Sequence, residues 1–145
     1  MSFNIVSAKI SGIPNELGWT QVHEFKPEDE EKLLKRGHLF AVFSTKKKEE
    51  SLDSVTAGRE LLSRLHEEYF GNMDTQAFIA LKNAVSKVSG EFSKTWGDVE
   101  IAAVVVLEDV VYSAAVGGGK VAIYRDGAIA TILESEGLET IAASG

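Results

Sequence analysis

The chain has 145 residues, of which 44% are hydrophobic, so it is long enough for one domain with a core and too short to predict two. A charged fraction of 26% and a formal net charge of −7 leave no basic excess to favour nucleic acid or an anionic membrane surface as a partner. The absence of cysteine excludes a disulfide framework, a thiolate metal site and a cysteine nucleophile. The longest apolar stretch, at residues 101–107, is too short to span a membrane, and we expect a cytoplasmic protein.

The first third of the sequence predicts a hairpin followed by a short helix. Residues 3–10 alternate loosely between apolar and polar, residues 12–15 (Gly-Ile-Pro-Asn) have the composition of a turn, and residues 19–23 alternate again. Pro27 then precedes a run of acidic residues followed by basic ones, which is typical of a helix that begins at proline. We expect this helix to end at Gly37.

The central part predicts a buried strand and two amphipathic helices. Residues 39–43 (Leu-Phe-Ala-Val-Phe) form a continuous apolar run, which is typical of a strand buried on both faces. The apolar residues of 52–70 lie on one helical stripe, and those of 78–92 follow a 3,4 spacing. Asp74 is the expected N-cap of the second helix, and each helix should cover an apolar surface.

The last third predicts two antiparallel hairpins. Their polar turns are Glu108-Asp109 and Asp126-Gly127, the second of which has the composition preferred by two-residue hairpin loops. The strand pairs are 101–107 with 110–116, and 121–124 with 128–133. Strands on both sides of a helical hairpin indicate the α+β class. We interpret residues 1–133 as a single domain and residues 134–145 as a tail that could serve as a linker.

Two groups of residues suggest a ligand site without carrying one. Gly117-Gly118-Gly119-Lys120 resembles part of a phosphate-binding loop, but Val121 stands where that motif needs a serine or threonine for magnesium. We therefore interpret the glycines as a tight connection between two strands. His23, His38 and His66 lack the spacing of metal ligands and are interpreted as structural or surface residues.

Three segments read together resemble the metal-dependent type 2C protein serine/threonine phosphatases. The strand at residues 39–43 corresponds to the family strand that runs into an Asp-Gly-x-Gly loop. The segment VYSAAVGGGKVAIYRDGAIATIL is similar to a family pattern of strand, Val-Gly-Asp-Ser-Arg, strand and Arg-Asp-Gly hairpin. The segment GIPNELGW is similar to the family's Asn-Glu-Asp turn and keeps Asn15 and Glu16. The resemblance implies a sandwich of antiparallel sheets with an outer helical hairpin, without the family's C-terminal strands.

The resemblance also implies that most metal ligands of the family are missing. Family members hold Mn²⁺ or Mg²⁺ with acidic oxygens, and the bound metal activates a water for attack on phosphoserine or phosphothreonine. Here Ser44 and Thr45 replace the bridging aspartate and its glycine, Leu17 replaces another aspartate, and Gly117-Gly118 replaces Gly-Asp. Only Glu16 is kept as a weak metal candidate, so we expect no bound cofactor and no catalysis by the family mechanism.

Three functional hypotheses follow. The first is a catalytically inactive phosphatase 2C-like domain that acts as a protein-binding or regulatory module, through a protein partner or self-association at a sheet edge. The second is an active metal-dependent serine/threonine phosphatase that uses Glu16, Asp98, Asp109 or Asp126 from unexpected positions. The third is an α+β domain of another kind, for instance a small-ligand sensor. Metal titration separates the first two hypotheses.

Overall fold

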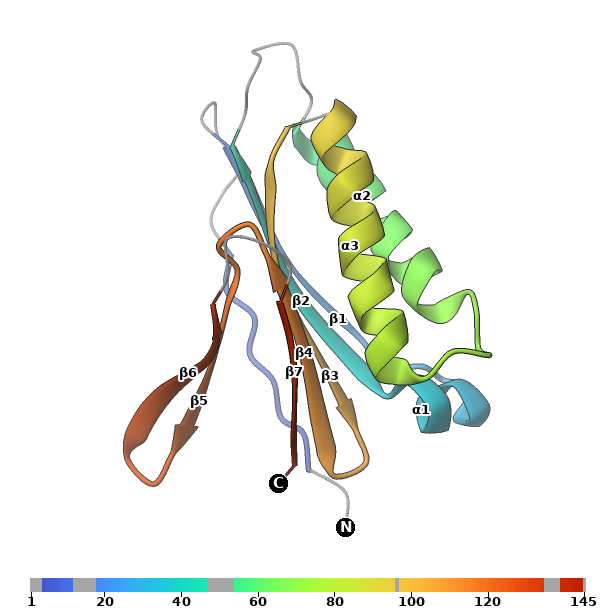
Figure 1. Cartoon of the computed structure of the whole chain (residues 1–145), viewed down its shortest axis with the longest axis vertical. Helices are drawn as coiled ribbons and strands as arrows, with labels where there is room; N and C mark the ends of the chain where they lie inside the picture. The colour runs from blue at the N-terminus through green and yellow to red at the C-terminus, as the bar shows by residue number, and fades with distance from the viewer. Residues whose placement is uncertain (1–3, 12–17, 47–53, 96, 135–138, 145) are drawn as a thin grey trace.

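A computed structural model describes residues 4–11, 18–46, 54–95, 97–134 and 139–144, and it has a mixed α+β fold (Figure 1). The described residues form a five-stranded antiparallel sheet in the order β1-β2-β3-β4-β7, a two-stranded antiparallel sheet of β5 and β6, and three helices. The strands are β1 (Gly18–Phe25), β2 (His38–Lys46), β3 (Val99–Leu107), β4 (Val110–Val116), β5 (Lys120–Arg125), β6 (Ala128–Glu134) and β7 (Glu139–Ser144), and the helices are α1 (Glu30–Arg36), α2 (Ser54–Phe70) and α3 (Ala77–Thr95).

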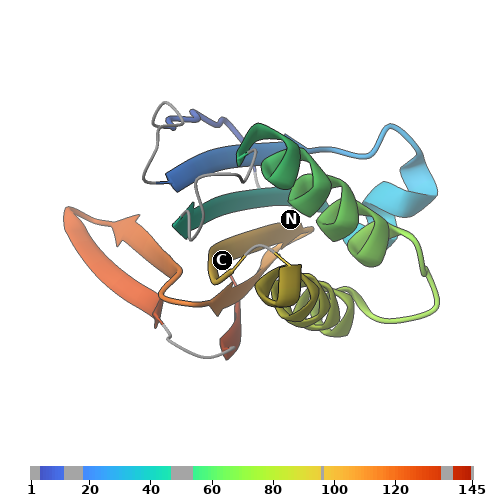
Figure 2. The same cartoon turned by 90° about the horizontal axis from the view of Figure 1, so that it is seen from above.

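Helices α2 and α3 cover one face of the five-stranded sheet, and the β5–β6 hairpin projects from the other side (Figure 2). The core lies between the helices and the sheet. The strands contribute every second side chain to the core, and each helix contributes the side chains of its apolar stripe, as the amphipathic patterns predict. Large side chains that are fully buried there include Leu39, Phe43, Leu61, Leu65, Tyr69, Leu81, Val85, Ile101 and Val105. The α+β class is confirmed, whereas the phosphatase 2C-like sandwich of two packed sheets stays a prediction.

Helix α1 begins and ends with capping interactions that the sequence indicates. Asp29 is its N-cap and accepts a hydrogen bond from the Lys32 backbone N–H at 2.9 Å. Gly37 ends the helix with a φ of 71°, as expected, and its N–H donates to the Leu33 carbonyl at 2.9 Å. Pro27 precedes the N-cap, so the helix begins at Glu30 rather than at the proline.

The predicted helical hairpin of α2 and α3 is confirmed, with one difference at its turn. Helix α3 begins at Ala77, and Asp74 does not cap it. The Asp74 backbone N–H instead donates to the Asn72 side chain at 3.0 Å, which makes this segment a turn between the helices.

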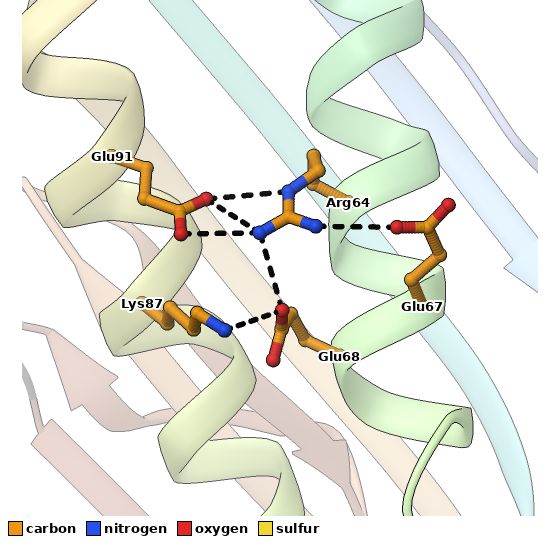
Figure 3. A network of polar contacts seen from close by, with 5 residues as sticks. All are labelled: Arg64, Glu67, Glu68, Lys87 and Glu91. Carbon is orange, nitrogen blue, oxygen red and sulfur yellow. Dashed lines mark hydrogen bonds and ion pairs between the residues drawn. The ribbon is translucent and has the colours of Figure 1, made fainter.

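Polar contacts on the outer surface tie α2 to α3 (Figure 3). The Arg64 guanidinium of α2 lies 2.9 Å from the Glu91 carboxylate of α3 and 3.2 Å from Glu68. Lys87 of α3 pairs with the same Glu68 carboxylate at 2.8 Å. Hydrogen bonding to Glu91 raises the pKa of Arg64, and hydrogen bonding to Arg64 lowers the pKa of Glu91. Lys87 and Glu91 are exposed and Arg64 and Glu68 are partly exposed, so the network orients the two helices and adds little to stability.

Strand β2 is fully buried on one face and only partly on the other, so the expectation that both faces are covered is wrong at Val42. Leu39 and Phe43 are fully buried under the helices, whereas Val42 on the opposite face is 50% exposed. Because α2 and α3 cover a single face and the β5–β6 hairpin projects away, the second face of β2 keeps solvent access.

Two predictions at the ends of the chain are also wrong. Residues 4–11 form no strand, so the predicted first hairpin is not made by this described segment, whose Ser7 and Lys9 side chains bind Glu24 instead. Residues 139–144 are not a free tail, because they form β7 and pair with β4 from Val110 to Ala115. Pairing satisfies the backbone N–H and C=O groups that β4 would otherwise expose at a sheet edge.

None of the helices in the described ranges is long and apolar enough to cross a membrane.

Candidate functional site

Two of the places where the resemblance expects metal ligands lie at the same end of the five-stranded sheet. They are Ser44-Thr45 and Gly117-Gly118. Ser44 and Thr45 lie near the end of β2, where Ser44 stands opposite Glu100 of β3. Gly117 and Gly118 follow β4, whose last residue Val116 stands opposite Ile101 of β3. The two positions therefore flank the beginning of β3 from its two sides.

Ser44 and Thr45 point to opposite faces of the sheet. Phe43 is buried beneath the helices, so alternation places Ser44 on the uncovered face. Glu100 is directly opposite Ser44 in the register and shares this face. The Thr45 hydroxyl donates to the Asp98 carbonyl at 3.0 Å, which ties the end of β2 to the loop before β3.

The glycines after β4 are required by a tight turn, as the interpretation of Gly117-Gly118-Gly119-Lys120 as a strand connection predicts. Gly117 and Gly118 have φ values of 69° and 97°, which glycine adopts without strain. The Gly119 N–H donates to the Val116 carbonyl at 3.2 Å. A Cβ on Gly119 would lie 2.0 Å from the Ile101 carbonyl oxygen, so the backbones approach too closely for any side chain there.

Glu100 is a carboxylate that the fold brings next to both of these positions. A Cβ built on Gly118 would lie 3.5 Å from a Glu100 carboxylate oxygen, and Glu100 is exposed. The sequence analysis missed this residue, because its role depends on the β2–β3 register. The alternation of Val99, Glu100 and Ile101 was the available signal, since it marks Glu100 as the outward residue of a half-buried strand.

Of the other proposed carboxylates, Asp98 directly precedes β3 and lies at this end of the sheet, whereas Asp109 and Asp126 lie in turns elsewhere. Asp109 lies in the turn after β3, and the 9 residues of β3 at the strand rise place it roughly 30 Å from Asp98. Asp126 lies in the β5–β6 turn with a φ of 52°, which supports its interpretation as a hairpin former. Glu16 and Leu17 lie outside the described residues. Within those residues, no group of three or more His, Asp or Glu side chains could hold a metal ion.

The histidines are structural residues, as predicted, but two of them meet. The ring of His66 on α2 lies 6.5 Å from that of His23 on β1 and 4.4 Å from that of Phe25, measured between centroids. Burial is the main cause that lowers the pKa of both histidines. The third, His38, lies 2.9 Å from a Glu24 carboxylate oxygen. Local sequence patterns do not predict the contact between His23 and His66, because these residues are 43 positions apart.

Comparison of the chain with protein-family models, with curated proteins and with solved structures gave no match.

Proposed function

We propose that this chain is a catalytically inactive phosphatase 2C-like domain that acts as a protein-binding or regulatory module. The observation that carries the proposal is the placement of Ser44 and Gly118 on either side of β3 at one sheet end. These are two positions at which the resemblance expects acidic residues, and they are neighbours of the same carboxylate, Glu100.

The chemistry of this sheet end argues against a dinuclear metal centre. Mg²⁺ and Mn²⁺ prefer several carboxylate oxygens, and Glu100 supplies the carboxylate of one residue. Each aspartate that is replaced removes an attraction on the order of several kcal/mol for a divalent cation. The hydroxyl of Ser44 is neutral and does not replace this attraction.

The local backbone also argues against simple restoration of the family site. Gly118 has a φ of 97°, so an aspartate at this position is strained. An aspartate in place of Ser44 would stand directly opposite Glu100, and like charges at opposed positions destabilise a strand pair. The site is therefore compatible with a turn and a strand end rather than with a cluster of carboxylates.

Sheet edges provide a route for partner binding. In the described strand order, β1 and β7 are the two outermost strands of the five-stranded sheet. The outer N–H and C=O groups of an edge strand can pair with an added strand from a protein partner or from a second copy.

Calorimetric titration of Mn²⁺ and Mg²⁺, with a phosphothreonine peptide hydrolysis assay on the same sample, tests the proposal. We expect no binding tighter than about 1 mM and no phosphate release. The double variant Ser44→Asp/Thr45→Gly, which rebuilds the family loop, should behave in the same way. Micromolar binding together with turnover by the wild-type chain would instead establish the active phosphatase, with ligands from carboxylates assigned here to turns.

A further inference from the structure

The described N-terminal segment, residues 4–11, runs along the five-stranded sheet without belonging to a strand (Figure 1). Its side chains point alternately toward the sheet and into solvent, as those of an extended chain do. Val6 and Ile10 are 92% and 90% exposed, whereas Ile5 is 36% exposed and lines a groove at the end of the sheet. Among the described residues, no backbone hydrogen bond joins this segment to a strand. We call residues 4–11 the strap.

One carboxylate, that of Glu24 on β1, holds the strap to the sheet. The Ser7 hydroxyl donates a hydrogen bond to Glu24 Oε2 at 2.7 Å, and the Lys9 ammonium lies 3.3 Å from the same oxygen. Glu24 lies on the sheet face opposite the helices, because the adjacent Phe25 packs against His66 of α2. The hydrogen bond from Ser7 is the main cause that lowers the pKa of Glu24, so the carboxylate keeps its charge while the strap is docked.

The same carboxylate stands beside a shielded histidine. His38 Nε2 lies 2.9 Å from Glu24 Oε1, the oxygen that the strap does not contact. His38 is 9% exposed, and together with Asn4 and Ile5 of the strap it lines a half-open groove of about 490 Å³. Its Nε2 atom is buried, yet it makes no well-aligned hydrogen bond among the described residues. The docked strap therefore keeps water from a polar nitrogen that water could satisfy.

We propose that the strap is a detachable cover that controls access to His38 and to the groove. When docked, it supplies one wall of the groove and occupies Glu24 Oε2. When undocked, it leaves an imidazole beside a carboxylate on an open sheet face. The free energy of docking is small, because the strap gains two contacts to a single carboxylate and no backbone pairing with a described strand. Val6 and Ile10 stay in water in the docked state, so they add no apolar burial that would hold the strap in place.

Limited trypsin digestion of the full chain tests the proposal, because Lys9 is itself a cleavage site within the strap. Cleavage after Lys9 requires the undocked state, so its rate reports the undocked population. Glu24→Gln keeps the shape of the side chain and removes its charge, and it should speed this cleavage by on the order of tenfold. Glu31→Gln is the matched control. It removes the charge of another carboxylate that pairs with a lysine, 2.8 Å from Lys35 on α1, and should leave the rate unchanged.

Ser7→Ala repeats the test with a change on the strap alone, so that the result does not depend on the folding of β1. This variant loses the hydrogen bond to Glu24 and should also speed cleavage after Lys9 severalfold. It should further raise the rate at which diethylpyrocarbonate modifies His38. His66 of α2, on the other side of the sheet, is the internal reference and should react at an unchanged rate.

Three results would overturn the proposal. Cleavage of the wild-type chain after Lys9 as fast as that of a free peptide of residues 1–15 would show that the strap does not dock. Unchanged cleavage in both Glu24→Gln and Ser7→Ala would show that the Glu24 carboxylate does not hold it. Faster cleavage without faster modification of His38 would show that the strap does not cover the histidine.

Discussion

The contact between α2 and β1 depends on a glycine, and this gives the sharpest stability prediction. Gly58 is buried on the inner side of α2, where the indole ring of Trp19 packs against it. A Cβ at this position would lie 1.9 Å from the nearest Trp19 ring carbon. Trp19 is 5% exposed and its ring is stacked on Phe43 with centroids 6.5 Å apart, so the indole has little room to move. Gly58→Ala must therefore displace either the helix or the ring.

The magnitude is the balance of two opposing effects. Alanine favours a helix over glycine by about 1 kcal/mol, whereas overpacking a core costs about 1–3 kcal/mol and sometimes more. The overlap at Gly58 is severe, so we expect a net loss of about 2 kcal/mol. Gly90 of α3 is the matched control, because a Cβ there meets no atom within 4 Å. Gly90→Ala should gain about 0.5–1 kcal/mol.

Urea denaturation followed by circular dichroism measures both variants on one scale. At about 4 °C per kcal/mol for a chain of this size, their melting temperatures should differ by on the order of 10 °C. A Gly58→Ala variant as stable as the wild type would refute the reasoning, because it would mean that Trp19 does not pack against α2 as described.

Three further predictions concern buried polar groups. Tyr69→Phe removes the hydrogen bond that the Tyr69 hydroxyl donates to the Arg36 carbonyl at 2.6 Å, and should cost about 1–2 kcal/mol in urea denaturation; an unchanged midpoint would contradict it. Burial lowers the pKa of His23 and His66 below the usual histidine value of about 6.5, so the unfolded chain binds more protons below about pH 6.5 and stability should fall as the pH drops from 6.5 towards 5. This fall, measured as melting temperature against pH, should be shallower in His66→Phe, and an identical profile would exclude the histidine pair as its cause. The Ser113 hydroxyl is buried without a hydrogen-bond partner among the described residues, so Ser113→Ala should be neutral or stabilise by up to about 1 kcal/mol, and a clear loss of stability would show a partner for that hydroxyl.

The features that the sequence predicts correctly are those with a local physical cause. Gly37 and Asp126-Gly127 specify a helix end and a hairpin turn through their own backbone preferences. The apolar spacing of 78–92 likewise predicts the buried face of α3, because helical periodicity needs no information about the partner surface.

The features that the sequence does not predict depend on which segments meet. Residues 139–144 have little pattern of their own and become a strand because β4 offers an unpaired edge. Val42 reads as a buried strand residue, and its exposure depends on the direction in which the β5–β6 hairpin projects. At the candidate site, the residue types at Ser44 and Gly118 were readable from the sequence, but their common neighbour Glu100 follows only from strand register.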